Sequence, residues 1–332
     1  MFKYTFTRVW LKRKKDPLDK MVERHVLSVC SLLLTVLVTV KSEDMLPKLL
    51  MISMDGFKHD YLELPGLKEE NIANFRTMIN NGVRVEHVIN VFPTVTYPNH
   101  YTLITGLYPE HHGIVHNRFY DSSSEVKDHF MFDSRRDNFD PVWYDTGAEP
   151  IYVTNKLAGG KRLSGSALWP CGVGKVKGIA PDKLIPDADS WSKIEFNKLV
   201  DTVVGWFSDK TNPINLGLLY FDEPDHVSHV YGAGSTEVIT MINKLNDVLG
   251  HLFQRLKEEG LYEDMNIVIT ADHGFVNVTD IVVLSDYGLE EGTDYTTGSY
   301  FENHSTVHFY PKNITGKPMQ NIWLQNAVVC KN

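Results

Sequence analysis

Three apolar segments of this sequence each run, directly or across one residue, into an aspartate, and this pattern constrains the fold more than any other feature. The segments and the acids that follow them are LPKLLMISM (46–54) with Asp55, INLGLLYF (214–221) with Asp222, and NIVIT (266–270) with Asp272. Short apolar runs separated by segments of helical periodicity predict an α/β fold with a parallel sheet. Ligands bind at the carboxyl ends of such strands. A single aspartate there is usually a turn former or helix cap, whereas three favour a common site.

The segments between these strands carry helix signals. Residues 69–81 have apolar side chains at helical spacing and are followed by Gly82. Residues 235–259 form the strongest predicted helix, with one apolar stripe that stops at Gly260. Residues 83–91 are predicted to form a further strand.

The first 42 residues are predicted to lie outside the folded domain. Residues 26–40 are apolar, Ser or Thr throughout, and a basic run precedes them at 12–15. A run of this length is typical of a signal-peptide core, with cleavage after Ser42. An uncleaved signal anchor is the alternative, and it would be the chain's only contact with a membrane. We therefore expect a leader at 1–42 and a folded domain at 43–332, exported as an extracellular, secreted or cell-surface protein.

Cysteine usage and glycosylation sequons are consistent with an exported protein, and the net charge limits its ligands. The three cysteines are Cys30, Cys171 and Cys330. The first lies in the leader, so a mature chain can form at most one disulfide. Sequons predict N-glycosylation at Asn277, Asn303 and Asn313. The formal charge of −9 argues against a binder of nucleic-acid polymers, but it allows metal ions held by carboxylates.

The residues after the predicted strands suit a metal centre. Asp225 and His229 are four residues apart and can face the same way on a helical turn, although such pairs are also common on surfaces. Asp272 and His273 are adjacent just beyond a strand, and Asp55 adds a third carboxylate. Carboxylates and imidazoles together suit zinc. Two such ions about 4 Å apart can stabilise both the attacking and the leaving oxygen in phosphoryl transfer.

The stretch FPTVTYPNHYTLITGLY (92–108) contains two candidate nucleophiles, Thr94 and Thr96. Pro98 suits the first turn of a helix that ends near Gly106. Thr96 then lies at the amino end of that helix, where it is either an N-cap or a metal-activated nucleophile aided by the helix dipole. Thr94 lies in the preceding extended segment and is less well placed.

Several motifs, taken in order, resemble the ectonucleotide pyrophosphatase/phosphodiesterase family. They are MISMDGF, GVRVEHVINVFPTVTYPNHYTLITGLYPEHHGIVHNRFYD (82–121), EPIYVTNKL, LYFDEPDHVSH and TADHGF. The resemblance covers roughly residues 46–275. It implies an alkaline-phosphatase-like sandwich with a central, mostly parallel sheet flanked by helices.

The resemblance also implies a nucleophile and two zinc ions. The nucleophile is Thr96. The ligands of one zinc are Asp55, Thr96, Asp272 and His273. The ligands of the other are Asp225, His229 and a further histidine.

Substrate contacts follow from the same resemblance. Asn117 matches an asparagine that binds phosphate oxygens together with the backbone amide beside the nucleophile. Tyr97 matches an aromatic residue that stacks on a nucleobase, and packing against its own helix is the alternative. Trp191 is the candidate for a second stacking residue. Val95 replaces a family lysine, which we expect to alter affinity more than chemistry.

The sequence departs from the family after TADHGF. The family's last zinc ligand lies in a His-Gly-Tyr setting that is absent here, and the later histidines His304 and His308 do not match its context. We therefore expect a domain truncated on its C-terminal side, with exposed apolar surface and an incomplete second zinc site.

The leading hypothesis is a zinc-dependent hydrolase of nucleotide phosphodiester or pyrophosphate bonds. It would act through a phospho-threonine intermediate and release nucleoside 5′-monophosphates. One alternative is a choline lysophospholipid phosphodiesterase, because Tyr97 could also face a cation. The other is a catalytically inactive glycoprotein.

Overall fold

The computed structural model describes residues 46–121, 128–131, 135–186, 194–277, 284–287, 295–297 and 309–311. The chain divides into two compact units, Met1–Leu46 and Pro47–Asn332, and the description below concerns the second. The leader lies outside the described residues, as do Trp191, Asn303, His304, His308 and Asn313. Within the described ranges, no helix is both long and apolar enough to cross a membrane.

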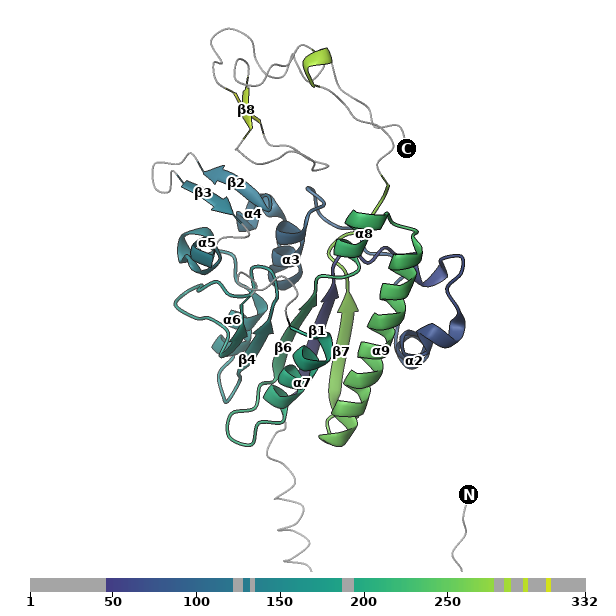
Figure 1. Ribbon diagram of the computed structural model, residues 1–332. Coiled ribbons are helices and arrows are strands. Elements are labelled where there is room, and N and C mark those ends of the chain that lie inside the picture. Colours follow the sequence, from purple (N-terminus) through teal and green to yellow (C-terminus); the bar gives the residue numbers. More distant parts are fainter. Residues whose placement is uncertain are drawn as a thin grey trace, which may run out of the picture. The chain divides into compact units, whose positions relative to one another are not determined.

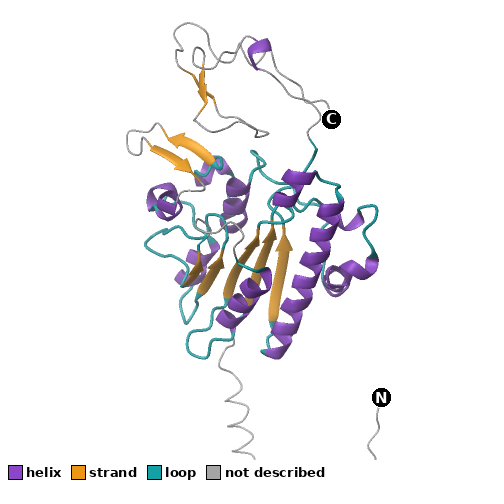
Figure 2. Ribbon diagram, viewed as in Figure 1, coloured by secondary structure: helices purple, strands orange, loops and turns teal. Residues whose placement is uncertain are grey.

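Five parallel strands form the central sheet, as the sequence predicts (Figures 1 and 2). Their order across the sheet is β5 (Lys183–Ile185), β4 (Ser164–Ala167), β6 (Leu216–Phe221), β1 (Lys48–Met54) and β7 (Met265–Thr270). The three strands that run into acids are therefore neighbours, with β1 in the middle. Their carboxyl ends meet at one edge of the sheet.

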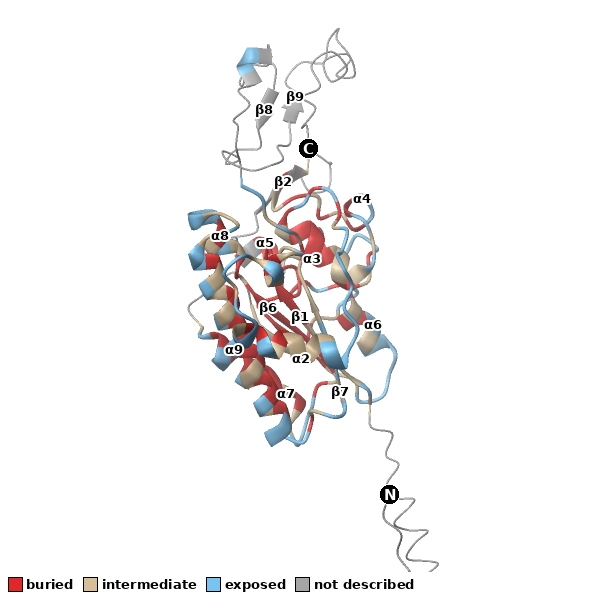
Figure 3. Ribbon diagram, turned by 90° about the vertical axis from the view of Figure 1, so that its right-hand side faces the viewer, coloured by how far each residue is buried: buried red, intermediate tan, exposed pale blue. Residues whose placement is uncertain are grey.

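Helices cover both faces of this sheet (Figure 3). On one side, α7 (Phe196–Phe207) and α9 (Thr236–Glu258) pack against each other. On the other side lie α3 (Thr96–Thr105) and α6 (Ile151–Leu157). The predicted helix at 235–259 is confirmed as α9. Its N-cap is Ser235, whose side chain accepts a hydrogen bond from the Val238 N–H.

The remaining predicted elements fared differently. The helix expected at 69–81 is a short 3₁₀ turn, η2 (Glu69–Ile72), followed by α2 (Ala73–Asn81). The strand expected at 83–91 is wrong, because that segment has no regular secondary structure. A strand needs a hydrogen-bonded neighbour. Most apolar side chains of residues 83–91 face solvent or a groove instead; Val83, for example, is 94% exposed, and only Val91 at the end of the segment is buried.

The other described elements are short. They are η1 (Tyr61–Glu63), α4 (Pro109–His112), β2 (Arg118–Asp121), β3 (Asp128–Met131), α5 (Arg135–Phe139), η3 (Pro141–Trp143), α8 (Asp225–Tyr231), η4 (Leu284–Tyr287), β8 (Tyr295–Thr297) and β9 (Phe309–Pro311). Strands β2 and β3 pair antiparallel, as do β8 and β9.

A groove of about 770 Å³ runs beside β7, the end strand of the sheet. Residues 82–88 form one wall, and the other wall includes residues 267–276. Exposed valines gather along it, among them Val85 at 67% and Val276 at 77% exposure. The groove reaches Asp272 and His273 and therefore adjoins the acids at the sheet edge.

Candidate metal centre

Side chains that follow β1, β6 and β7 lie close together, although the acid after β6 that does so is Asp225 and not Asp222. One ligand atom each from Asp55, Asp225 and His273 lies within 4.8 Å of the others. Asp55 follows β1 directly, Asp225 is the first residue of α8 after β6, and His273 follows β7. Adjacent strands thus bring two carboxylates and an imidazole to one point. Asp272 directly precedes His273 in the sequence.

Backbone hydrogen bonds fix this convergence. The Asp55 N–H donates to the Phe221 carbonyl at 2.9 Å, and the Asp225 N–H donates to the Asp55 carbonyl at 3.0 Å. The Gly56 N–H donates to Oδ1 of Asp272 at 3.2 Å. These bonds tie the turn after β1 to residues from both neighbouring strands.

Gly56 is required at the centre of this turn. Its φ of +63° is a conformation that L side chains rarely adopt. A Cβ atom there would lie 2.9 Å from both Cβ and Oδ1 of Asp225. Glycine therefore allows the carboxylates after β1 and β6 to approach each other.

Three carboxylate oxygens in this cluster are buried without a hydrogen bond from any described residue. They are Oδ1 of Asp55, Oδ1 of Asp225 and Oδ2 of Asp272. His273 Nε2 lies 3.3 Å from both Asp55 Oδ1 and Asp272 Oδ2, outside hydrogen-bond geometry. Buried carboxylate oxygens without partners are costly, and a bound cation offsets that cost. The oxygen and nitrogen donors present fit zinc.

The electrostatics of the metal-free cluster point the same way. Burial raises the pKa of Asp55 well above its ordinary value, and the charges of Asp272 and Asp225 raise it further. Burial opposes the charged form of His273, but the same two carboxylates outweigh it and raise the pKa of His273. The site therefore favours added positive charge, which is the role of a metal ion.

His229 lies at the outer side of the cluster. Its Nε2 is 3.3 Å from Oδ2 of Asp225, one helical turn earlier on α8. The Asp225 carboxylate raises the pKa of His229, whose side chain is 64% exposed. The predicted Asp225–His229 pair thus forms on one helix face. The compact triad, however, mixes ligands from both zinc sets that the family resemblance implies.

Thr96 begins α3 beside this cluster. The N-cap of α3 is Val95, and no side chain caps the helix, so the capping role considered for Thr96 is wrong. The Thr96 carbonyl accepts a hydrogen bond from Nδ1 of His100 at 2.9 Å, and the same nitrogen lies 3.3 Å from Oδ2 of Asp272. Thr96 is half-buried, whereas Thr94 is exposed. The role of Thr96 as nucleophile stays a prediction.

Asn117 reaches the residue after Thr96. Its Oδ1 accepts a hydrogen bond from the Tyr97 N–H at 2.8 Å. The two groups expected to bind phosphate oxygens are therefore neighbours, although in this structure they bond to each other. A phosphate oxygen would have to take the place of Asn117 Oδ1 at the Tyr97 amide.

The expected base-stacking residues receive no support from their surroundings. Tyr97 is only 1% exposed, and Asn138 Nδ2 donates to its hydroxyl at 3.5 Å. A ring this deeply buried cannot stack on a ligand unless the groups covering it move. Its role stays a prediction, as does that of Trp191, which lies outside the described residues.

His112, near the candidate nucleophile in sequence, and Asn277, the one predicted glycosylation site among the described residues, have local partners. His112 is buried, with Nε2 3.0 Å from Thr102 Oγ1 and Nδ1 accepting from the Ile114 N–H. Burial lowers the pKa of His112 to about 4. Asn277 is exposed, and its Oδ1 accepts from the Ala233 N–H at 2.8 Å. Glycosylation there stays a prediction.

Sequence reasoning missed three polar residues beneath the cluster. Ser53, His100 and Tyr220 are buried, and each contacts a residue of the site or another member of the three. The available signal was a polar side chain within an apolar strand, as in LGLLYF. Such a residue carries a desolvation cost that a partner must offset.

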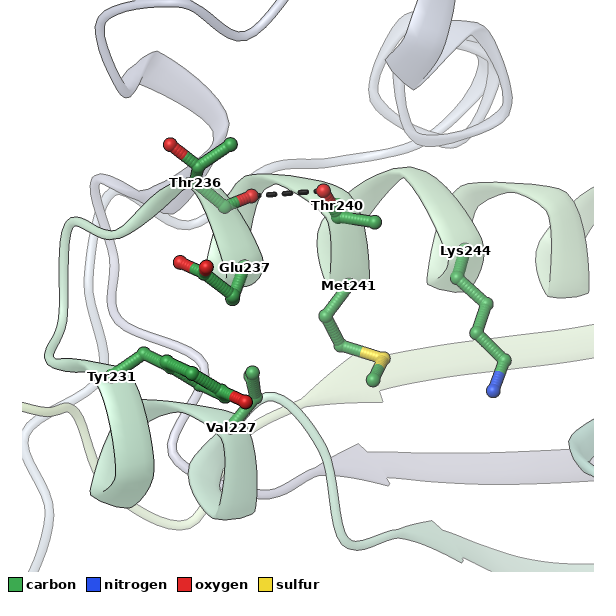
Figure 4. Close-up of a pocket in the computed structure, with 7 residues that line it drawn as sticks. All are labelled: Val227, Tyr231, Thr236, Glu237, Thr240, Met241 and Lys244. Carbon is green, nitrogen blue, oxygen red and sulfur yellow. Dashed lines mark hydrogen bonds between the residues drawn. The ribbon is translucent and has the colours of Figure 1, made fainter.

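A smaller hollow of about 240 Å³ lies between α8 and α9 (Figure 4). It is lined by Val227, Tyr231, Thr236, Glu237, Thr240, Met241 and Lys244. All of these residues are in the described part of the chain, and none belongs to the cluster of acids and histidines. We assign it no chemistry.

Comparison with known proteins identifies relatives of this chain. The sequence profile of the family "Type I phosphodiesterase / nucleotide pyrophosphatase" matches residues 49–325. The bis(5′-adenosyl)-triphosphatase of Mus musculus is 34% identical over 296 residues, which cover 86% of this chain and 61% of that protein. Its Homo sapiens counterpart is 38% identical over 302 residues, covering 86% of this chain and 62% of that protein. The chain thus spans about three fifths of these curated relatives.

Solved structures give the same result. Murine ectonucleotide pyrophosphatase/phosphodiesterase 5, as an inactive threonine-to-alanine variant in complex with AMP, matches with a TM-score of 0.71 and 33% identity. The match covers 83% of this chain and 68% of that one. The same murine protein without the substitution matches with a TM-score of 0.70 and 34% identity. The expected α/β fold, with its mostly parallel sheet flanked by helices, is confirmed.

Proposed function

Because this chain belongs to the type I phosphodiesterase / nucleotide pyrophosphatase family, we propose that it hydrolyses nucleotide phosphodiester or pyrophosphate bonds in a zinc-dependent reaction. The observation that carries the proposal is the cluster of Asp55, Asp225 and His273, with its unpartnered oxygens, beside the start of α3. The nucleotide named in the related structure, AMP, supports this substrate class.

The residues that would hold zinc are those at the sheet edge. Asp55, Asp272, His273 and Thr96 would bind one ion. Asp225 and His229 would bind a second. Zinc bound there would act as a Lewis acid and stabilise negative charge on the phosphate oxygens. The second set has two protein ligands among the described residues, so we expect it to bind more weakly.

Thr96 is the proposed nucleophile. Its Oγ forms a bond to phosphorus as the bond from phosphorus to the leaving oxygen breaks, and water then hydrolyses the threonine ester. The amino end of α3 favours negative charge on this oxygen. The Tyr97 amide and the Asn117 side chain would donate hydrogen bonds to the phosphate. Attack on the phosphate attached to the nucleoside leaves the nucleoside monophosphate esterified to Thr96. Hydrolysis of that ester then releases a nucleoside 5′-monophosphate.

Hydrolysis of nitrophenyl-TMP by the purified chain with zinc tests this mechanism. Thr96→Ala should lower the rate by more than about 10³-fold, because no second hydroxyl replaces the nucleophile. Thr94→Ala, two residues away and exposed, is the matched control and should retain activity. Equal rates for wild type and Thr96→Ala would refute the mechanism.

Two other functions remain distinguishable by measurement. Comparing AMP and choline release from matched substrates separates the nucleotide activity from a lysophospholipid activity. Zinc stoichiometry measured alongside thermal unfolding separates both from an inactive glycoprotein, which would unfold cooperatively without binding zinc. We propose that the protein is exported through the secretory pathway, because residues 12–40 have the pattern of a leader.

A further inference from the structure

The metal cluster rests on a buried layer of polar and aromatic residues. Ser53 on β1 and Tyr220 on β6 are register partners in adjacent parallel strands, so their side chains project to the same face of the sheet. His100 on α3 packs on that face. All three are at most 3% exposed. None of them belongs to the ligand set proposed above.

Tyr220 contacts the cluster directly. Its hydroxyl donates a short hydrogen bond to Oδ2 of Asp55. The other oxygen, Oδ1, has no hydrogen bond and is the one within 3.3 Å of His273 Nε2. A hydrogen bond to one oxygen restrains the rotation of the carboxylate about its Cβ–Cγ bond. Tyr220 thereby presents Oδ1 to the position where Asp225 and His273 converge.

Tyr220 is itself held in place. Its ring meets the His100 ring edge to face, with centroids 5.0 Å apart. His100 Nδ1 bonds to the Thr96 carbonyl, which only accepts, so Nδ1 carries the hydrogen. His100 Nε2 lies 2.9 Å from Ser53 Oγ. Trp169 packs on the His100 ring from another side, with centroids 5.2 Å apart.

The sequence of the strand supports the same role. Strand β6 is LGLLYF, wholly buried, and tyrosine is its single polar residue. Phenylalanine would fill nearly the same space without burying a hydroxyl. A buried hydroxyl is retained at no net cost only when it has a partner. Here that partner is a candidate metal ligand.

We propose that Tyr220 is a positioning residue that orients the Asp55 carboxylate for metal binding. The proposal rests on the metal dependence of the proposed function, and it assigns Tyr220 no contact with substrate. Residues that hydrogen-bond to metal ligands typically change metal affinity by about 10- to 100-fold when removed.

Tyr220→Phe deletes the hydroxyl and keeps the ring. We expect its zinc affinity, measured by competition with a chelating dye, to fall about 10- to 100-fold. Its metal-free form should still unfold cooperatively, and zinc should raise its melting temperature less than it does for wild type. Activity lost at limiting zinc should return at high zinc concentration, which a merely structural defect would not show.

Tyr152→Phe is the matched control. Tyr152 is also buried, and its hydroxyl donates to the Gly174 carbonyl at 2.7 Å, away from the cluster. Its zinc affinity should equal that of wild type. Ser53→Ala, which removes the His100 support, gives a second test in case Tyr220→Phe folds poorly, and it should weaken zinc binding by a few-fold.

The outcomes separate this proposal from the proposed function. Unchanged zinc affinity in Tyr220→Phe, or an equal loss in Tyr152→Phe, would overturn the positioning role even if the wild type hydrolyses nucleotides. If the wild type binds zinc but does not hydrolyse nucleotides, the proposed function is overturned. Weaker zinc binding in Tyr220→Phe would still support the positioning role in that case. Wild type that binds no zinc would overturn both.

Discussion

The two sides of β1 differ in how completely they are packed. On the β6 side, all six residues of β6 are buried, and the sheet continues through β4 and β5. On the other side, β7 is the end strand, its residues are half-buried or exposed, and Val268 is 45% exposed. The candidate metal centre draws residues from both sides. Asp55 follows β1 itself, Asp225 follows β6 on the closed side, and Asp272 and His273 follow the open strand.

The strands on the two sides differ in burial, but the acids that follow them do not. Asp272, after the outer strand β7, is 3% exposed, as is Asp55, and it accepts a hydrogen bond from the Gly56 N–H. Local stability follows buried apolar contacts and protected hydrogen bonds. We therefore expect substitutions in β7 to cost less stability than substitutions in β1.

The largest expected effect on zinc binding comes from Gly56→Ala, which would disturb the close contact between the turn after β1 and Asp225. The added Cβ would lie 2.9 Å from Asp225 Oδ1 at a φ of +63°. We expect a loss of about 2–4 kcal/mol in the free energy of unfolding and a large loss of zinc affinity. Urea denaturation and zinc titration measure both.

Gly260→Ala is the control for backbone strain alone. Gly260 has a φ of +67°, and no described atom lies within 4 Å of the position that a Cβ would take. Gly260→Ala should lower the free energy of unfolding by about 1 kcal/mol and leave zinc affinity unchanged. Equal effects of the two substitutions would contradict the role of close packing at Gly56.

A pair of substitutions outside the candidate metal centre, expected to change stability but not zinc binding, sharpens the comparison within the sheet. Ile52 and Ile269 are register partners on β1 and β7, and Ile52 is 1% exposed while Ile269 is half-buried. Ile52→Ala should cost about 3–5 kcal/mol in the free energy of unfolding, and Ile269→Ala about 1–2 kcal/mol. Chemical denaturation gives both values. Similar costs would show that the end strand is packed as tightly as its neighbour.

The last expected effect concerns a buried histidine outside the candidate metal centre, which makes the stability of the fold depend on pH. Burial lowers the pKa of His112 to about 4 in the folded protein, while an unfolded histidine titrates near about 6.5. Between these values the unfolded chain binds the proton and the folded chain does not. His112 therefore does not lower the free energy of unfolding above pH ~6.5, and it lowers that free energy progressively as the pH drops toward ~4. The slope from this group is at most about 1.4 kcal/mol per pH unit.

His112→Gln should remove that part of the acid-induced loss, measured as the difference from wild type in urea denaturation across this pH range. His111→Gln, at the neighbouring exposed position, should follow wild type. An unchanged pH profile in His112→Gln would contradict the assignment.

Local pattern was enough for the elements whose signals lie within one segment. The helix predicted at 235–259 and the strands predicted before Asp55 and Asp272 are all present. The segment 83–91 has the same apolar alternation as a strand but lacks a paired neighbour, which no local pattern reveals.

The acids at the strand ends, and hence the class of chemistry, were determined by the sequence alone, because residue type and position after a buried strand are local properties. Only the tertiary structure decided that β1 lies between β6 and β7, since the order of parallel strands depends on crossover connections. That order brings Asp55, Asp225 and His273 together and places Tyr220 under Asp55. Hydrogen bonds between residues 165 positions apart have no signature in the chain until it folds.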